Sequence, residues 1–283
     1  MAMKTLRFFL AIAVALSLQL NVCGQDYRFP GNAGNLTTVN RESGITSPVT
    51  VTVIYDNYVH SEGMKPDWGY SILIEGLDKT VLFDTGTKPA IFSSNFKLTG
   101  IDAGSIDILA FSHEHLDHVG GLSAFAEMKT GIPAVIPHSF TPPVVSSIVN
   151  AGYIPLLVRD AAMICNNLYT SGEFDFWIAE QCLVLDTRAG LVVMTGCAHP
   201  GIVRMLSEIK QTFNKNIVAV FGGFHLMDKS KAGTEEIIAG MKSLGIVRCG
   251  ATHCTGEKQI DMFREAFGEN YFELGAGNRV IFN

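Results

Sequence analysis

The feature that most constrains the fold of this chain is the hexapeptide HEHLDH at residues 113–118. An apolar stretch of strand length, residues 106–112, comes just before it, and two glycines and a helix-like stretch, residues 122–128, come just after it. A strand-to-helix loop is where α/β sheets usually carry binding groups, and glycines let the backbone turn sharply there. Imidazole nitrogens and carboxylate oxygens suit zinc and neighbouring first-row metals. The hexapeptide therefore predicts a metal site.

The same hexapeptide resembles the HxHxDH signature of the metallo-β-lactamase superfamily, and the flanking strand, glycine pair and helix agree with it. The resemblance implies an α/β (α+β) fold, a four-layer αββα sandwich, with a one- or two-metal centre at one edge. It also implies that His113 and His115 bind one metal, and that Asp117 and His118 bind the second.

The remaining chain alternates between strand-like and helix-like stretches. Apolar and β-branched runs predict strands at residues 49–55, 70–75, 80–83, 134–136, 181–187, 191–194, 217–221 and 246–248. Amphipathic spacing predicts helices at residues 89–98, 122–128, 202–212 and 234–244. Residues 141–169 are of mixed character, and we expect them to form a wall of the substrate site.

Three of the later strands each lead into a loop that carries glycine and histidine, at residues 195–201, 222–226 and 252–256. Strands that alternate with helices give α/β order, which places these loops at one end of a sheet. The resemblance implies that His199 completes the first three-histidine set and that His253 joins the second metal. Three protein ligands per metal leave a position open, which is the catalytic arrangement. It also implies that Asp84, before Thr85-Gly86, orients a ligand or the metal-site loop.

The aspartate that usually bridges the two metals in the superfamily is absent from its strand-end position. In one assignment His225 takes its place; in the other Cys197 does, and His199 is a ligand in both. Cys197 is equally compatible with a small buried apolar role. We predict that His225 acts in catalysis, with Asp117 and Asp84, as a general acid or a group that holds charge on the substrate. His225→Ala should then keep both metals and lose activity.

Further motifs narrow the resemblance. TGCAHPGIV, FGGFHL and THCTG, with Asp56-Asn57 and LFDTG upstream, resemble the subfamily that includes the dihydropterin ribofuranosyl-aminobenzene phosphate synthases. This similarity runs from about Val49 to the C-terminus. Trp68 stands where that subfamily tends to carry histidine, and this departure, like the predicted export, weakens the case for the pterin-pathway role.

The first residues have the character of an export signal. Lys4 and Arg7 precede an apolar run at residues 8–20 that is short for a membrane span, and small residues precede Gln25. Residues 1–24 are therefore predicted to be a signal peptide, residues 25–48 a flexible leader and residues 49–283 the folded domain. The predicted location is periplasmic or secreted, and the mature chain is expected to have no membrane span. A lipoprotein anchor at Cys23 and a retained membrane anchor are the alternatives.

The net charge limits the possible partners, and the number of cysteines limits the possible disulfides. Loss of residues 1–24 would remove two basic residues and no acidic one, which changes the formal net charge from −6 to −8. Such a surface argues against non-specific nucleic-acid binding, and we expect a small-molecule substrate. The mature chain would keep five cysteines, so at least one thiol would stay unpaired.

The sequence thus predicts an exported hydrolase with two divalent metal ions, which attacks an ester, phosphoester or related bond with a metal-activated hydroxide. Zinc is the expected metal, with manganese or iron as alternatives. The other function classes are an iron-dependent oxidoreductase of the same fold and a non-catalytic metal-dependent binding protein. We expect negligible β-lactam hydrolysis. A fold name does not define a substrate, and Cys197 precedes His199 by two residues, whereas the true β-lactamases of the superfamily that this sequence resembles place their cysteine well downstream of the third-site histidine.

Overall fold

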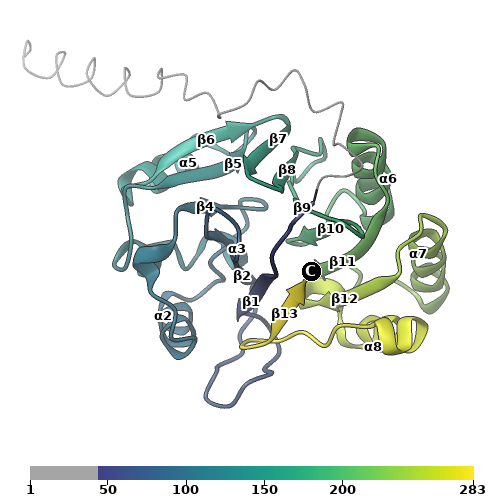
Figure 1. Ribbon diagram of the computed structural model, residues 1–283. Helices are drawn as coiled ribbons and strands as arrows, with labels where there is room; N and C mark the ends of the chain where they lie inside the picture. Colours follow the sequence, from purple (N-terminus) through teal and green to yellow (C-terminus); the bar gives the residue numbers. More distant parts are fainter. Residues whose placement is uncertain (1–43) are drawn as a thin grey trace, which may run out of the picture. The chain divides into compact units, whose positions relative to one another are not determined.

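The computed structural model describes residues 44–283, and Figure 1 shows the arrangement of their helices and strands. The predicted signal peptide and most of the predicted leader lie outside the described residues. The described end of the leader contacts the domain, because Ile45 is buried and its N–H donates to the Asp186 carbonyl oxygen at 3.0 Å. Among residues 44–283, no helix has the length and apolar character needed to cross a membrane.

One sheet contains seven strands in the order β13-β1-β2-β3-β4-β5-β6. Their bounds are β13 (Arg279–Phe282), β1 (Val49–Tyr55), β2 (Ser71–Glu75), β3 (Val81–Phe83), β4 (Ile108–Ala110), β5 (Pro133–Pro137) and β6 (Ile154–Val158). β1 is rich in β-branched side chains and is buried along nearly its whole length, which favours an inner strand. The β2–β3 hairpin and the strand β1 agree with the sequence prediction.

The second sheet has six strands in the order β12-β11-β10-β9-β8-β7. They are β12 (Arg248–Thr252), β11 (Ile217–Gly223), β10 (Gly190–Thr195), β9 (Leu183–Thr187), β8 (Leu168–Gly172) and β7 (Asp160–Cys165). β9 and β10 form the predicted antiparallel hairpin. β10, β11 and β12 run parallel as neighbours, so the loops that follow them meet at one edge of the sheet, as predicted.

Helices cover the outer face of each sheet. Side chains of α2 (Pro89–Leu98), α4 (Leu122–Ala126) and α5 (Pro142–Asn150) share a core with the first sheet. Side chains of α6 (Ile202–Phe213), α7 (Lys231–Ser243) and α8 (Glu257–Phe267) share a core with the second. Figure 1 shows α6, α7 and α8 on one side of the molecule and α2 and α5 on the other. The layers are helix, sheet, sheet and helix, as predicted.

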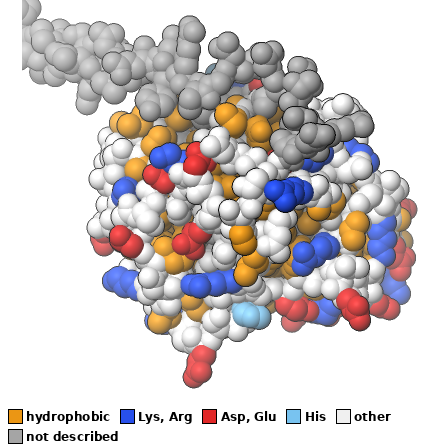
Figure 2. Space-filling model, in the orientation of Figure 1, with side chains coloured by type: hydrophobic (Ala, Val, Ile, Leu, Met, Phe, Trp, Pro, Cys, Tyr) orange, Lys and Arg blue, Asp and Glu red, His pale blue; other side chains and the backbone are white. Residues whose placement is uncertain are grey.

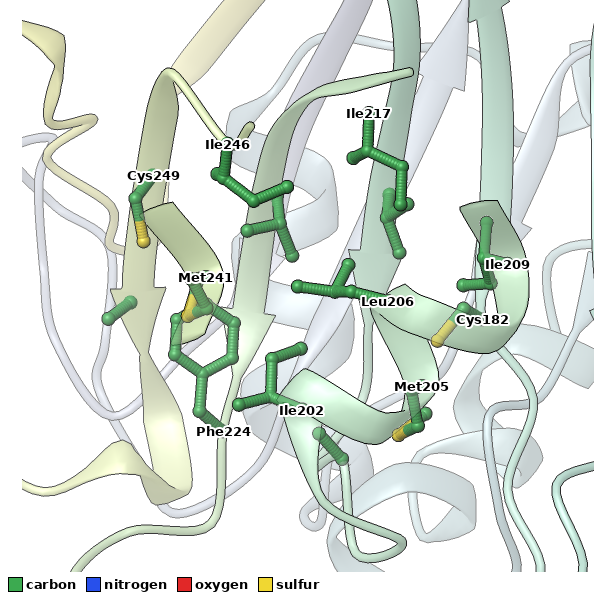
Figure 3. Close-up of a cluster of buried hydrophobic side chains, with 14 of the residues drawn as sticks. Cys182, Ile202, Met205, Leu206, Ile209, Ile217, Phe224, Met241, Ile246 and Cys249 are labelled. Carbon is green, nitrogen blue, oxygen red and sulfur yellow. The ribbon is translucent and has the colours of Figure 1, made fainter. Parts of the chain in front are cut away.

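The packing of α6 shows how the second core places the site. Ile202, Met205, Leu206, Ile209 and Phe213 recur at helical spacing and are all buried. In Figure 3 Leu206 of this helix points towards Ile217 and Ile246, and Ile202 lies near Phe224, all within one core cluster. Each such side chain contributes about 1.5–3 kcal/mol through burial. This packing fixes the start of α6 directly after the histidine-bearing loop at residues 195–201.

Several local features differ from the sequence expectation. The strand before the hexapeptide is confined to Ile108–Ala110, and the hexapeptide itself enters a short helix, α3 (Leu116–Val119). Residues 141–169 form α5, β6 and β7 and begin β8, so they belong to the regular fold. Pro142 and Pro143 favour the first turn of α5, where a missing N–H costs nothing, whereas Pro155 lies in β6.

Candidate metal centre

The predicted ligands lie together at one edge of the two sheets. The hexapeptide follows β4 of the first sheet, and the loops with His199, His225 and His253 follow β10, β11 and β12 of the second. Their donor atoms form three groups within which every atom lies within 4.8 Å of the others. The groups are His113, His115 and His199; Asp117, His118, Cys197 and His253; and Cys197, His225 and Cys254.

The first group contains only imidazoles. His113 Nε2 lies 3.1 Å from His115 Nδ1, and the His199 ring centroid lies 4.8 Å from each of the other two. Both ring nitrogens of His199 are buried, and neither has a hydrogen-bond partner among residues 44–283. A buried polar atom without a partner is costly in a protein interior. The group therefore fits a metal ion, which would bind such a nitrogen.

Electrostatics favour neutral imidazoles in this group. Burial, followed by the charges of His225, His115 and His118, lowers the pKa of His199 to about 3. Burial and the neighbouring histidines hold the pKa of His113 well below its ordinary value. Neutral imidazole is the form that donates a lone pair to a metal.

The second group adds a carboxylate and a thiol. Asp117 Oδ2 lies 3.2 Å from His253 Nε2 and 3.6 Å from His118 Nε2, and Cys197 Sγ lies 3.2 Å from His118 Nε2. Burial raises the pKa of Asp117, but the hydrogen bond and charge of His253 and the charge of His118 outweigh it, so the pKa is below the ordinary value. Asp117 is therefore ionised at neutral pH. Of the two candidates for the place of the missing aspartate, Cys197 lies in this group and His225 does not.

Asp84 lies where the resemblance implied, behind a ligand. Its Oδ2 is 2.7 Å from His118 Nδ1, and its two oxygens accept hydrogen bonds from the N–H and the hydroxyl of Ser112, each at 2.7 Å. Burial lowers the pKa of His118, but the Asp84 carboxylate raises it overall to about 9. Asp84 thus holds a proton on Nδ1 and turns Nε2 towards Asp117 and Cys197.

Glu180 is a site residue that the sequence did not indicate. This buried carboxylate accepts the backbone N–H groups of Cys197, Ala198 and His199 at 2.8, 2.8 and 2.9 Å. It therefore holds the loop that carries two of the donor residues. Gly196 lets Ser112 lie close to this loop, because a Cβ at position 196 would clash with the Ser112 hydroxyl. The only sequence signal was an acidic residue directly before an apolar strand.

Side chains at positions 56, 57 and 68 support the second group through polar contacts. Trp68 Nε1 donates to Asp117 Oδ2 at 2.9 Å, and the Trp68 ring lies 5.1 Å from that of His253. Asn57 Oδ1 lies 2.9 Å from His253 Nδ1. Asp56 accepts from the Thr252 hydroxyl at 2.8 and 2.9 Å. The Asp56-Asn57 motif and the departure at position 68 thus both lie at the site.

His225 lies at the rim of the site. Its side chain is exposed, its φ is 50°, and its ring centroid lies 4.2 Å from that of His199. Both histidines line a cavity of about 420 Å³ at the start of α6. Phe176 and Trp177 form an aromatic part of its wall, and Arg204 and Lys229 add positive charge.

Comparison with known proteins agrees with this geometry. The family described as the metallo-beta-lactamase superfamily matches residues 65–143. A 7,8-dihydropterin-6-methyl-4-(beta-D-ribofuranosyl)-aminobenzene-5'-phosphate synthase of Methanocaldococcus jannaschii is 32% identical, with 77% of this chain and 92% of the relative covered.

Two solved structures share the fold. The structure of Tm1679, described as a metal-dependent hydrolase of the beta-lactamase superfamily, has a TM-score of 0.70 at 27% identity, over 82% of this chain and 98% of that one. YhfI of Bacillus subtilis, a metallo-beta-lactamase fold protein, has a TM-score of 0.60 at 14% identity, over 83% and 100%. With the ligand groups at the same sheet edge that the hexapeptide predicts, the chain belongs to the metallo-β-lactamase superfamily.

Proposed function

We propose that this protein is a metal-dependent hydrolase that uses two divalent ions, with zinc the expected metal, to cleave an ester or phosphoester bond of a small molecule. The observation that carries the proposal is the pair of donor groups beside a cavity, in which both ring nitrogens of His199 are buried and have no hydrogen-bond partner among residues 44–283. The similarity to the metal-dependent hydrolase Tm1679 supports the same reaction class.

The three groups among residues 44–283 contain nine donor residues. Six of them divide between two ions in the way that the resemblance implies. His113, His115 and His199 would hold one ion, and Asp117, His118 and His253 would hold the other. Such ions, when bound, polarise the scissile bond and lower the pKa of water. The donor set of imidazoles and one carboxylate suits zinc, manganese or iron.

The protein's own residues keep these donors in position. Asp84 fixes the tautomer and direction of His118, and Glu180 fixes the backbone before His199. Trp68 limits the rotation of the Asp117 carboxylate by holding one of its oxygens. Because these contacts exist in the protein alone, little reorganisation is needed when substrate binds.

The cavity suggests the kind of substrate. Its aromatic wall at Phe176 and Trp177 suits a ring, and Lys229 and Arg204 suit an anionic group. The named product of the Methanocaldococcus jannaschii relative contains a dihydropterin and a phosphate. We therefore propose a phosphoester or ester with an aromatic or heterocyclic part as the substrate class.

Removal of metal tests the proposal. Protein treated with a chelator should lose at least about a hundredfold of its activity on chromogenic aryl phosphates or aryl esters, and zinc or manganese should restore it. His113→Ala, purified and assayed in parallel, should stay inactive after metal is added, which excludes a contaminating enzyme. Full activity of metal-free protein, or no turnover of any such substrate by metal-loaded protein, would contradict the proposal.

We also propose that the protein is exported, as the character of residues 1–24 suggests. Intact-mass measurement of the protein from its natural host should give a chain that begins at Gln25. A lipid-modified Cys23 or an uncleaved chain would contradict this cleavage.

A further inference from the structure

A third group of donor atoms shares Cys197 with the second group, and its other two residues are not among the six ligands of the proposed reaction. It consists of the Cys197 and Cys254 thiols and the His225 imidazole, whose donor atoms all lie within 4.8 Å of one another. Each of the five cysteines among the described residues is a free thiol. The two thiols of this group are therefore available as ligands.

The topology of the second sheet brings these three residues together. Cys197 follows β10, His225 follows β11 and Cys254 follows β12, and β11 lies between the other two strands. Parallel strands end at the same edge, so three consecutive strand ends each contribute one donor. This is the same construction that gathers the histidines of the first two groups.

The backbone is shaped around the thiols. Cys197 and Cys254 are each only 2% exposed. A Cβ at Gly223 would lie 2.7 Å from Cys254 Sγ, so only glycine allows the thiol to occupy this position. The hydrogen bond that the Cys254 thiol donates to the Cys197 carbonyl oxygen is long, at 3.7 Å. Such a sulfur hydrogen bond is weak, and the thiol remains free to exchange it for a metal.

We propose that Cys197, Cys254 and His225 bind a third cation, of the thiophilic class to which zinc belongs. Two thiolates and one imidazole form a softer donor set than the imidazole and carboxylate groups beside them, and such sets select zinc or monovalent copper. His225 also lines the cavity, so a fourth ligand can reach the ion from there. This site goes beyond the proposed hydrolase reaction and does not depend on it.

This assignment determines which ion Cys197 binds and where the thiol protons go. Cys197 then belongs to the third ion, and Asp117, His118 and His253 remain as three ligands for the second. Each thiol gives up its proton to the solvent when it binds the ion, with no change in oxidation state. An ion on both thiolates also protects them from oxidation in an export compartment.

Metal stoichiometry and cobalt spectra test the site. Full-length mature protein, prepared with a phosphine reductant and loaded with zinc, should contain three equivalents, and the cobalt-loaded protein should show a thiolate-to-cobalt charge-transfer band. Cys254→Ala should lose one equivalent and this band while it keeps the other two. Cys249→Ala is the matched control, because this buried thiol lies on β12 outside the group, and it should keep three equivalents and the band.

The outcomes separate the site from the other assignments. Two equivalents of zinc in the unaltered protein would overturn the proposal. A Cys197–Cys254 disulfide, or a charge-transfer band that persists in Cys254→Ala, would also overturn it. Where Cys254→Ala does not fold, His225→Ala decides: loss of one equivalent supports the site, and retention of all three overturns it and agrees with the acid–base role that the sequence predicts. If protein with two equivalents of zinc hydrolyses the substrate, only the proposal of a third site is rejected. If protein with three equivalents of zinc shows no hydrolysis, only the proposed hydrolase function is rejected.

Discussion

At the scale of single residues, the second donor group depends on the contact between the Asp84 carboxylate and His118. Asp84→Asn keeps the shape but removes the charge beside His118 Nδ1. The imidazole can then turn or change its tautomer, so we expect metal affinity at this group to fall by about 10–100-fold, with activity falling in parallel. Competition with a chromophoric chelator measures the affinity. Asp107→Asn, at a surface pair with Lys79, should leave both quantities unchanged.

Trp68 offers a second test at this scale. Trp68→Phe removes the N–H that donates to Asp117 Oδ2, and the other features of an aromatic side chain remain. A hydrogen bond to a charged group is worth about 1.5–3 kcal/mol, and partial exposure reduces this, so we expect metal affinity to weaken by roughly fivefold to tenfold. Trp68→His, the residue of the related subfamily, should recover most of the loss because it restores a donor. If Trp68→Phe binds metal with the same affinity as the control Trp177→Phe, the hydrogen bond from Trp68 to Asp117 has no such role.

At the scale of elements, the loop between β10 and α6 depends on a residue of a different segment. Glu180→Gln replaces one carboxylate oxygen with an amide that points towards backbone N–H groups, so at least one donor loses its partner. The free energy of unfolding should fall by about 1–3 kcal/mol, as measured by urea denaturation. Glu236→Gln on the exposed face of α7 is the control and should change stability by less than about 0.5 kcal/mol. An unchanged midpoint for Glu180→Gln would contradict the role given to this carboxylate.

The same scale shows what the sequence could and could not predict. The hexapeptide was visible because its donors are neighbours in sequence, and the later histidines because each follows an apolar strand. Glu180 could not be found this way, since its partners are the N–H groups of a loop on another strand. The proximity of Cys254 to Cys197 depends likewise on the order of β10, β11 and β12. The strand β13 was missed because its partner β1 lies at the other end of the domain.

At the scale of the whole molecule, the donor groups connect the two sheets. His113, His115, Asp117 and His118 follow the first sheet, whereas His199 and His253 follow the second. Bound metal should therefore stabilise the native state against unfolding. At a free-ion concentration about 100 times Kd the gain is about 2.7 kcal/mol, which raises the Tm by roughly 5–10 °C over metal-free protein. Calorimetry measures the shift, and a protein with His113→Ala and His253→Ala together should show little of it.

One face of the molecule shows how its charged side chains are distributed. On the face shown in Figure 2, basic side chains are dispersed among acidic and apolar ones, and the described residues of that face form no continuous basic patch. The predicted absence of nucleic-acid partners stays a prediction.

The pairing of β13 with β1 also has a consequence for biosynthesis. β1 is the first described strand to leave the ribosome and β13 is the last, yet they are neighbours in register from Val49–Phe282 to Thr52–Arg279. Until residues 279–282 have been translated, β1 has a bare edge that can pair with other nascent chains. A chain kept unfolded until it has crossed a membrane avoids this hazard, because all its strands become available together. A stop codon just before Arg279 should accordingly yield aggregates rather than a slightly weakened enzyme.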